Sequence, residues 1–427
     1  MLWLLLAQAH AFCGSYVGPV GDVPANGSSR IIVAYDGKDT TVTMTADAQQ
    51  VPRQFGMLVP VPAGTTEQDV KVLTDLSDLD DLDLYTAPRL VAYTCDSLYG
   101  WGETSSVSGG CGDAVAGGCG AAFDEGIELA GQMALDALEA QVPGIDQLGF
   151  FTEGDLAVHI LDADSGSALQ TWLDLNGFGT VDGSDELLDN YIDQDVHFLA
   201  VEATMPIVGR DAWLDPIQVT YPGEKVQMLP LRLGSMNASG DQEVTLFTLV
   251  PDSDGAAQIT TFDEVTQESE CMPAPGVDVV DTLGAAFDEA IGNKAGGWVT
   301  EYSWPSQVKC DPCPEDYVEP GAWVQSLGGP SAGAHITRMR MRFDPFRLDE
   351  ELQWQYTKDS STRQLRYIEH ADALEGDFPI CLEGWAEPPA GTCEDTRTES
   401  TTTSARLPGG TLLLFPLLGW LARRERR

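Results

Sequence analysis

The motif with the sharpest chemical meaning in this sequence is Cys310-Asp-Pro-Cys313. Two cysteines separated by two residues can form a redox centre, because a neighbouring thiol lowers the pKa of its partner. The same pair could supply half of a four-cysteine zinc site, although the sequence has no second pair at this spacing. A redox pair usually stands at the start of a helix, and Pro312 and Pro314 oppose a helix here. The motif therefore favours a structural disulfide and leaves the redox and metal alternatives open.

The other cysteines indicate further disulfides. The chain has nine cysteines, and in an exported protein such residues are typically oxidised. Cys111 and Cys119 flank one short loop and Cys381 and Cys393 flank another, so we expect each pair to be bonded, with up to ~3 kcal/mol of stabilisation apiece. Because nine is odd, at least one cysteine is free or pairs with another chain. The candidate disulfide residues are Cys13, Cys95, Cys111, Cys119, Cys271, Cys310, Cys313, Cys381 and Cys393.

Motifs of the common enzyme classes are missing from the sequence. It has no G-x-S-x-G elbow, H-E-x-x-H pair, P-loop or G-x-G-x-x-G loop. His159 and His197 stand in predicted strands among apolar neighbours, where a half-exposed strand residue is more typical than a base or a metal ligand. We therefore predict no catalytic residue and no cofactor.

Two aspartate-rich turns begin like calcium loops. They lie at residues 162–166 and 252–255, and neither has the glutamate that an EF-hand needs at its twelfth position. Turns stabilised by aspartate side chains explain both segments, so we predict no metal site.

The charge balance excludes one class of partner. The chain has 67 acidic against 23 basic residues and a formal net charge of −44. Such a surface repels nucleic acid, because binding requires cationic side chains that release counterions. The acidic surface could bind a cationic or protein partner. The alternative is that it only keeps the protein well solvated.

The N-terminus has the layout of a secretory signal. Residues 2–7 are apolar, and Ala9-His-Ala11 provides a small-x-small site. We expect cleavage between Ala11 and Phe12, and thus export.

The C-terminus resembles the sorting signals of bacterial surface proteins. Gly409-Gly410 would be the sorting motif, an apolar stretch follows, and arginines end the chain. The stretch of about 15 residues is short of the roughly 20 that span a bilayer, and the arginines would stay cytoplasmic. We expect residues 407–427 to form a membrane or sorting helix that anchors the protein in the cell envelope; a C-terminal core helix is the alternative. Residues 386–406, rich in Thr, Ser, Pro and Glu, are predicted to be a disordered stalk.

The segments between these ends alternate between strand and helix patterns. A β-hairpin or a three-stranded meander is expected over residues 30–62, with the turn dipeptide Asp36-Gly37 between its first two strands. Further strands are expected at residues 150–161, 196–203, 225–233 and 243–250. Helices are expected near residues 73–87, 121–140, 167–175 and 186–192.

These patterns predict an α+β, sheet-dominated ectodomain with a few short helices and disulfide-stapled loops. We divide it into a β-rich region, residues 12–270, and a cysteine-containing second region, residues 271–385.

Several segments, taken in order, resemble a bacterial secreted family, the domain-of-unknown-function family twenty-three thirty. They lie at residues 11–17, 57–62, 87–93, 169–177, 229–234, 300–304 and 310–313. The resemblance implies an exported β-rich protein and supplies no activity or ligand. Because Cys13 and Cys95 both belong to its N-terminal part, we also expect them to pair.

Together these observations predict an exported, non-catalytic structural or binding component of the envelope. The rival hypothesis is an exported thiol-disulfide redox protein that uses Cys310 and Cys313.

Overall fold

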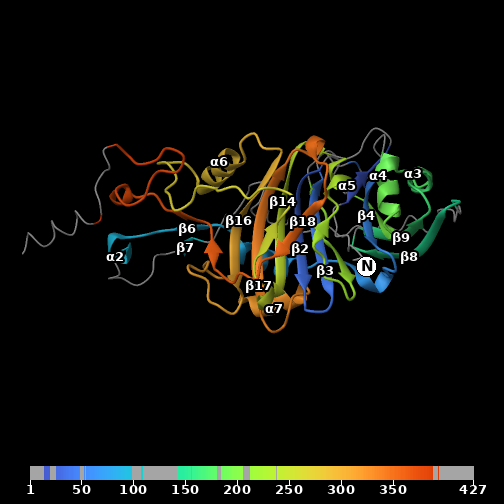
Figure 1. Cartoon of the computed structure of the whole chain (residues 1–427), viewed down its shortest axis with the longest axis horizontal. Coiled ribbons are helices and arrows are strands. Elements are labelled where there is room, and N and C mark those ends of the chain that lie inside the picture. The colour runs from blue at the N-terminus through green and yellow to red at the C-terminus, as the bar shows by residue number, and fades with distance from the viewer. Residues whose placement is uncertain are drawn as a thin grey trace, which may run out of the picture.

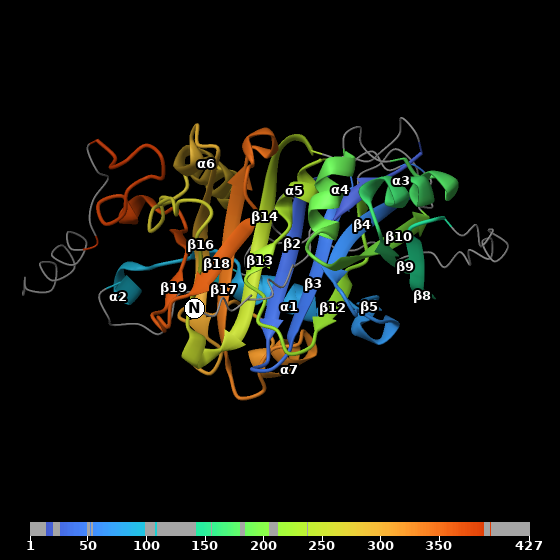
Figure 2. The ribbon, with the colours of Figure 1, turned by 45° about the vertical axis from the view of Figure 1, so that its right-hand side comes forward.

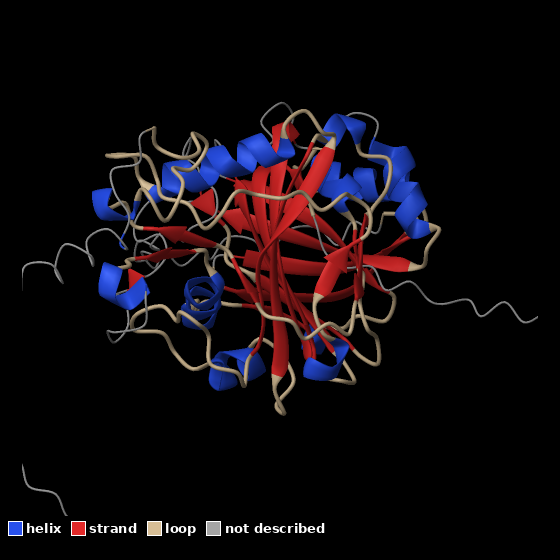
Figure 3. Ribbon diagram, turned by 60° about the vertical axis from the view of Figure 1, so that its left-hand side comes forward, coloured by secondary structure: helices blue, strands red, loops and turns tan. Residues whose placement is uncertain are grey.

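The computed structural model describes most of the chain as sheets with helices around them (Figure 1). The described residues are 14–19, 26–48, 52, 54–98, 107–108, 142–154, 156–179, 184–204, 212–236, 238–387 and 393. Strands occupy the interior and helices lie outside them, which confirms the predicted sheet-dominated α+β class (Figure 3). The predicted signal peptide, the helix at 121–140 and the C-terminal helix lie outside the described residues, as does most of the predicted stalk.

A nine-stranded sheet forms the centre of the fold. Its main path, in spatial order, is β19 (Arg363–Gln364), β16 (Gly296–Pro305), β17 (Ala334–Phe343), β14 (Ala238–Pro251), β2 (Asn26–Tyr35), β3 (Thr40–Ala48), β12 (Ile217–Tyr221) and β5 (Val70–Val72), and β11 (Ala212–Trp213) pairs with β3. The predicted hairpin is confirmed: β2 and β3 pair from Tyr35 and Thr40 onward, and Gly37 takes φ +105° in the turn. β14 and β2 are parallel neighbours.

A second, five-stranded sheet is antiparallel throughout. Its order is β1 (Ser15–Val17), β4 (Gln54–Pro62), β10 (Val196–Thr204), β9 (Leu156–Ala163) and β8 (Ile145–Glu153). β4 carries Pro60 and Pro62, which cannot donate to a ladder. In the described part of the chain, β1 pairs only with Gly56 to Leu58, so both prolines lie beyond its end.

The remaining elements are short. Two three-stranded sheets consist of β13 (Met228–Leu229), β18 (Leu352–Tyr356) and β15 (Ala257–Ile259), and of β20 (Arg366–Ile368), β6 (Arg89–Val91) and β7 (Val107–Ser108). The helices are α1 (Ser77–Thr86), α2 (Cys95–Leu98), α3 (Gly166–Leu175), α4 (Ser184–Ile192), α5 (Leu231–Ser235), α6 (Val279–Ile291) and α7 (Pro320–Ser326). Among the described residues, none of these helices has the length and apolar character to cross a membrane.

The largest apolar core lies between the two main sheets. Val33 and Met339 reach it from the nine-stranded sheet, Val59 and Ile160 from the five-stranded sheet, and Trp354 from β18. All five side chains are at most 3% exposed. Burial of large apolar side chains on this scale is the main stabilising contribution to the fold.

The opposite face of each main sheet is also covered. Helices α3 and α4 pack Leu169, Trp172 and Leu188 onto the five-stranded sheet (Figure 2). Helices α1 and α7 pack Leu82 and Trp323 onto the nine-stranded sheet. Because both faces are buried, β4 reads in the sequence as a nearly continuous apolar run. β16 is equally buried but carries the polar residues Thr300, Glu301 and Ser303.

Three predicted strands differ from the structure. Residues 150–161 are not one strand but parts of β8 and β9, which turn at Gly154 with φ +60°. Residues 225–233 contain the short β13 and helix α5, because Pro230 cannot continue a ladder and caps the helix instead. Residues 55–62 form β4, which belongs to the five-stranded sheet and not to the predicted meander.

The two regions predicted on either side of residue 270 share a sheet. β14, from the first region, pairs with β17, from the second, over the ten registered positions from Gln242 to Pro251. The boundary at 270 therefore runs between elements of one sheet.

His159 on β9 gives the fold a testable pH dependence. It lies between Phe150 and Trp172, with ring centroids 4.7 and 5.2 Å away, and burial lowers its pKa to about 4. The Glu202 carboxylate is 3.7 Å away, too far for a hydrogen bond that would offset burial. The unfolded chain binds a proton below about pH 6.5 and the folded chain does not, so stability falls as the pH drops from 6.5 to 4.

We predict that, between pH 7 and pH 4.5, the wild type loses about 2 kcal/mol more of its free energy of unfolding than His159→Gln does. Urea unfolding of both proteins at each pH measures this difference. Equal losses in the wild type and the variant would show that His159 is not buried in its neutral form.

Candidate functional site

The Cys310–Cys313 pair forms a disulfide in the segment between β16 and α7. Its Cα atoms are 4.9 Å apart, and the residues between the two cysteines form a turn. Cys310 is 4% exposed and packs in the cluster of Tyr85, Tyr302 and Trp323. The next helix, α7, begins only at Pro320, so no helix starts at the pair as it does in redox enzymes.

Two further disulfides join distant parts of the sequence. Cys95 is bonded to Cys393 and Cys271 to Cys381, across sequence separations of 298 and 110 residues. The predicted Cys381–Cys393 and Cys13–Cys95 pairs are therefore wrong. Cys111 and Cys119, like Cys13, lie outside the described residues.

The strand pairing explains why the predicted partners differ. β6 and β20 are parallel neighbours, which brings the segment after residue 91 beside the segment after residue 368. The backbone N–H of Cys381 donates to the Met272 carbonyl at 2.8 Å, so Cys271 and Cys381 lie on adjacent segments. Proximity in the sequence does not predict these disulfide partners, because tertiary pairing of the segments decides which thiols meet.

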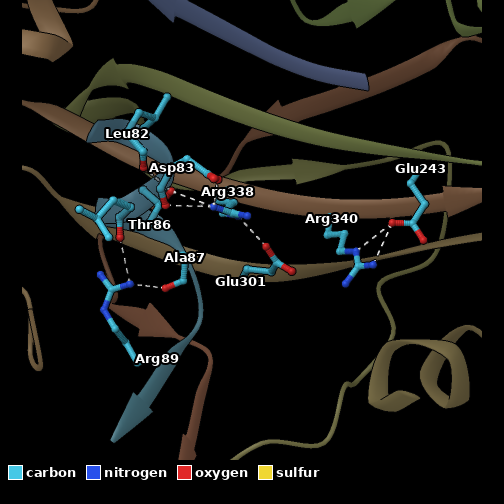
Figure 4. Close-up of polar contacts among 10 residues, drawn as sticks. Leu82, Asp83, Thr86, Ala87, Arg89, Glu243, Glu301, Arg338 and Arg340 are labelled. Carbon is cyan, nitrogen blue, oxygen red and sulfur yellow. Dashed lines mark hydrogen bonds and ion pairs between the residues drawn. The ribbon is translucent and has the colours of Figure 1, made fainter. Parts of the chain in front are cut away.

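A buried charged cluster is the second candidate site, since strongly perturbed charges often mark function. Arg338 on β17 is 2% exposed and donates to Glu301 Oε2 and Asp83 Oδ1, each at 2.6 Å (Figure 4). Burial alone lowers the pKa of Arg338, but the Asp83 and Glu301 carboxylates outweigh it and hold that pKa above its ordinary value. The cluster thus joins β17 to β16 and to helix α1.

Two neighbouring arginines on β17 continue this ladder. Arg340 and Arg342 both donate to Glu243 of β14, and Arg342 also pairs with Asp288 of helix α6. Both guanidinium groups lie over the Phe287 ring, at 4.2 and 5.0 Å from its centroid. These contacts hold α6 on the outer face of the sheet.

Arg89 completes the set at the C-terminal end of α1. Its guanidinium donates to the carbonyls of Tyr85, Leu84 and Ala87 at the C-terminal end of that helix. Figure 4 shows the contact with Ala87. Burial lowers the pKa of Arg89 to about 10. The hydrogen bonds described for this cluster all end on protein acceptors, so the arrangement positions helices.

A third candidate has the geometry of a hydrolase triad. His335 Nε2 lies 2.9 Å from Ser303 Oγ, and His335 Nδ1 lies 3.4 Å from Asp252 Oδ1. These are the roles of nucleophile, base and orienting acid. Ser303 is only 3% exposed and His335 is 0% exposed, so a substrate carbonyl cannot reach the hydroxyl. The trio joins β16, β17 and the turn after β14.

The remaining sequence candidates have structural partners. In the turn at 252–255, Asp254 pairs with Lys225 at 2.9 Å. In the turn at 162–166, Ser165 caps helix α3 by accepting a hydrogen bond from the Ala168 N–H. A cavity between β2, β14 and α5 has a volume of about 10 Å³, enough for one water molecule.

One family model matches most of the chain. The family described as "Uncharacterized protein conserved in bacteria (DUF2330)" matches residues 7–355. The chain belongs to the DUF2330 family. No curated protein matches it. The crystal structure of baculovirus P35 is similar over 81% of this chain and 97% of its own, at 9% identity and a TM-score of 0.25, and this likeness carries no argument.

Sequence reasoning missed the arginine ladder of this DUF2330 protein. Arg338, Arg340 and Arg342 alternate with Met339 and Met341, a pattern typical of a strand with one solvated face. The structure instead buries both faces of β17. The available signal was the excess of acidic over basic residues. In so acidic a chain, an arginine in a buried strand has many carboxylates with which it could pair.

The disulfides give the second testable prediction. In the chain-entropy account, a bond that closes about 100 residues stabilises a protein by roughly 4–5 kcal/mol, and one that closes about four residues by roughly 2 kcal/mol. We predict that Cys271→Ala with Cys381→Ala lowers the free energy of unfolding by about twice as much as Cys310→Ala with Cys313→Ala. Urea unfolding of the two double variants measures both losses.

Both variants remove one disulfide and two sulfur atoms, so each controls for the other. Equal losses would contradict the assigned loop sizes. A non-reduced peptide map that joins Cys381 to Cys393 would contradict the pairing itself.

Proposed function

We propose that this protein is exported and acts as a non-catalytic structural or binding component of the bacterial envelope. The long-range Cys95–Cys393 disulfide carries this proposal. Disulfides of this kind form and persist in oxidising compartments and are rare in the reduced cytosol. The Cys271–Cys381 bond adds to the argument, because it too closes a long segment of chain.

The packing of the described residues supports a non-catalytic role. Both main sheets are covered on both faces except at the edge strand β8, and Ser303 and His335 are buried, whereas Asp252 is exposed. Small-molecule sites are concave and usually hold several hundred Å³. The charged groups that could do chemistry instead form ion pairs and hydrogen bonds that join strands and helices.

The rival redox function is less well supported by the surroundings of Cys310 and Cys313. A redox thiol must be reached by its substrate, and Cys310 is 4% exposed beneath aromatic side chains. We therefore assign this disulfide a structural role in fixing the turn from Cys310 to Cys313 in the segment before α7.

We propose further that the C-terminal tail anchors the protein before any sorting cleavage at Gly409-Gly410. The apolar residues 411–422 are followed by Arg423 and Arg424, which favour a cytoplasmic end. Large apolar side chains each contribute roughly 1.5–3 kcal/mol when they enter lipid. Several such residues exceed what a single acyl chain supplies.

A chain that ends at Ser404 tests the anchor. We predict that this truncated protein is released in soluble form and stays folded, because the predicted stalk separates the tail from the core. The full chain should fractionate with membranes unless it has been cut near Gly410. Cell fractionation, N-terminal sequencing for a start at Phe12, and circular dichroism of the released protein provide the measurements.

A matched variant that lacks residues 2–11 separates export from anchoring. It should stay in the cytoplasm with reduced cysteines, whereas the exported protein should resist alkylation at Cys95 and Cys271 until it is reduced. A wild-type protein that retains Met1, or whose Cys95 and Cys271 are alkylated without reduction, would overturn the proposal.

A further inference from the structure

We propose that His370, Asp372 and Glu375 form a binding site for a divalent transition-metal ion of the Zn²⁺ type. The three residues lie in the segment that follows β20 and belong to none of the charged clusters described above. One ligand atom from each residue lies within 4.8 Å of the other two. The proposal does not depend on the protein's location or on its anchor.

The local backbone puts the three side chains together. Asp372 to Leu374 form a single 3-10 turn, η4, and Glu375 is its C-cap. Residues three apart eclipse one another in a 3-10 helix, so Asp372 and Glu375 share a side of the turn. His370 precedes the turn, and its Nε2 lies 3.2 Å from Glu375 Oε1.

The separations fit a small ion. Zinc bonds to nitrogen and oxygen of about 2.0–2.1 Å place neighbouring tetrahedral ligands roughly 3.3–3.4 Å apart. The His370–Glu375 separation of 3.2 Å already has this length. Asp372 is exposed, so its carboxylate can close the remaining distance by rotating its side chain.

The electrostatics of the turn also favour a cation. Asp372 and Glu375 bring two carboxylates close together, and among the described residues no lysine or arginine forms an ion pair with either. Two nearby carboxylates repel one another, and a bound cation would offset that repulsion. The remaining acidic groups of a chain with net charge −44 raise the local concentration of cations further.

The turn is held in place from several sides. Leu374, between the two carboxylates, is 1% exposed and packs with Met272, Ile368 and Cys393. The Glu369 N–H donates to the Val91 carbonyl at 2.9 Å. The Asp377 carboxylate accepts from the Cys393 N–H at 2.9 Å, beside the Cys95–Cys393 disulfide. A site on so restrained a segment loses little entropy when it binds an ion.

The ligand set decides which kind of ion fits. Calcium takes six to eight oxygen ligands and magnesium keeps most of its waters, so neither has a use for the imidazole. One imidazole and two carboxylates suit zinc, with water in the fourth position. The His370 and Glu375 side chains are 18% and 17% exposed, which leaves that position open to solvent.

Zinc titration of the purified full-length chain tests the site. Free thiols are first alkylated without reduction, and millimolar Mg²⁺ occupies unselective carboxylates. We expect calorimetry to show one equivalent of Zn²⁺ bound, with affinity at least tenfold weaker in His370→Gln and in Asp372→Asn. Asp372→Asn alters an exposed side chain and should leave the fold intact, which circular dichroism checks.

Two matched controls make the result specific. His197→Gln removes a histidine on β10, and Asp349→Asn removes an exposed carboxylate elsewhere; both should bind Zn²⁺ like the wild type. The proposal is overturned if the wild type binds no Zn²⁺, or if His370→Gln binds it with unchanged affinity. Loss of Zn²⁺ binding in millimolar Ca²⁺ would also overturn it, because the site would then be an unselective carboxylate pair.

Discussion

The buried guanidinium of Arg338 is the constraint on which the outer side of the nine-stranded sheet depends. A charge at 2% exposure is tolerable only when it is paired, and its two partners come from β16 and from α1. Arg340 and Arg342 repeat this arrangement toward β14 and α6. The ladder therefore fixes the positions of α1 and α6 on the sheet. Apolar packing alone would specify these positions less precisely.

The same arrangement explains why the interior contains charged groups without an evident active site. The arginines have carboxylate or carbonyl acceptors, and the Ser303–His335 pair is closed off by the strands that carry it. Disulfides then fasten the C-terminal part of the described chain, through Cys381 and Cys393, to segments that precede it. Disulfides of this kind suit an oxidising compartment, which the proposed export would provide.

Local features of the fold were predictable from the sequence and long-range ones were not. The β2–β3 hairpin follows from Asp36-Gly37, and α3 and α4 follow from apolar spacing within a few residues. Cys95 could not be matched to Cys393 because their approach depends on parallel pairing of β6 with β20. His370, Asp372 and Glu375 were missed because only a 3-10 turn, which has no clear apolar period, aligns them.

A double-mutant cycle on Asp83 and Arg338 tests most directly whether the ladder holds α1 on the sheet. The free energies of unfolding of Asp83→Ala, Arg338→Met, the double variant and the wild type give the coupling between the two side chains. A buried pair should couple by about 2 kcal/mol or more, whereas the exposed Arg363–Glu264 pair, measured in the same way, should couple by less than about 1 kcal/mol. A coupling between Asp83 and Arg338 no larger than that of the exposed pair would contradict the account.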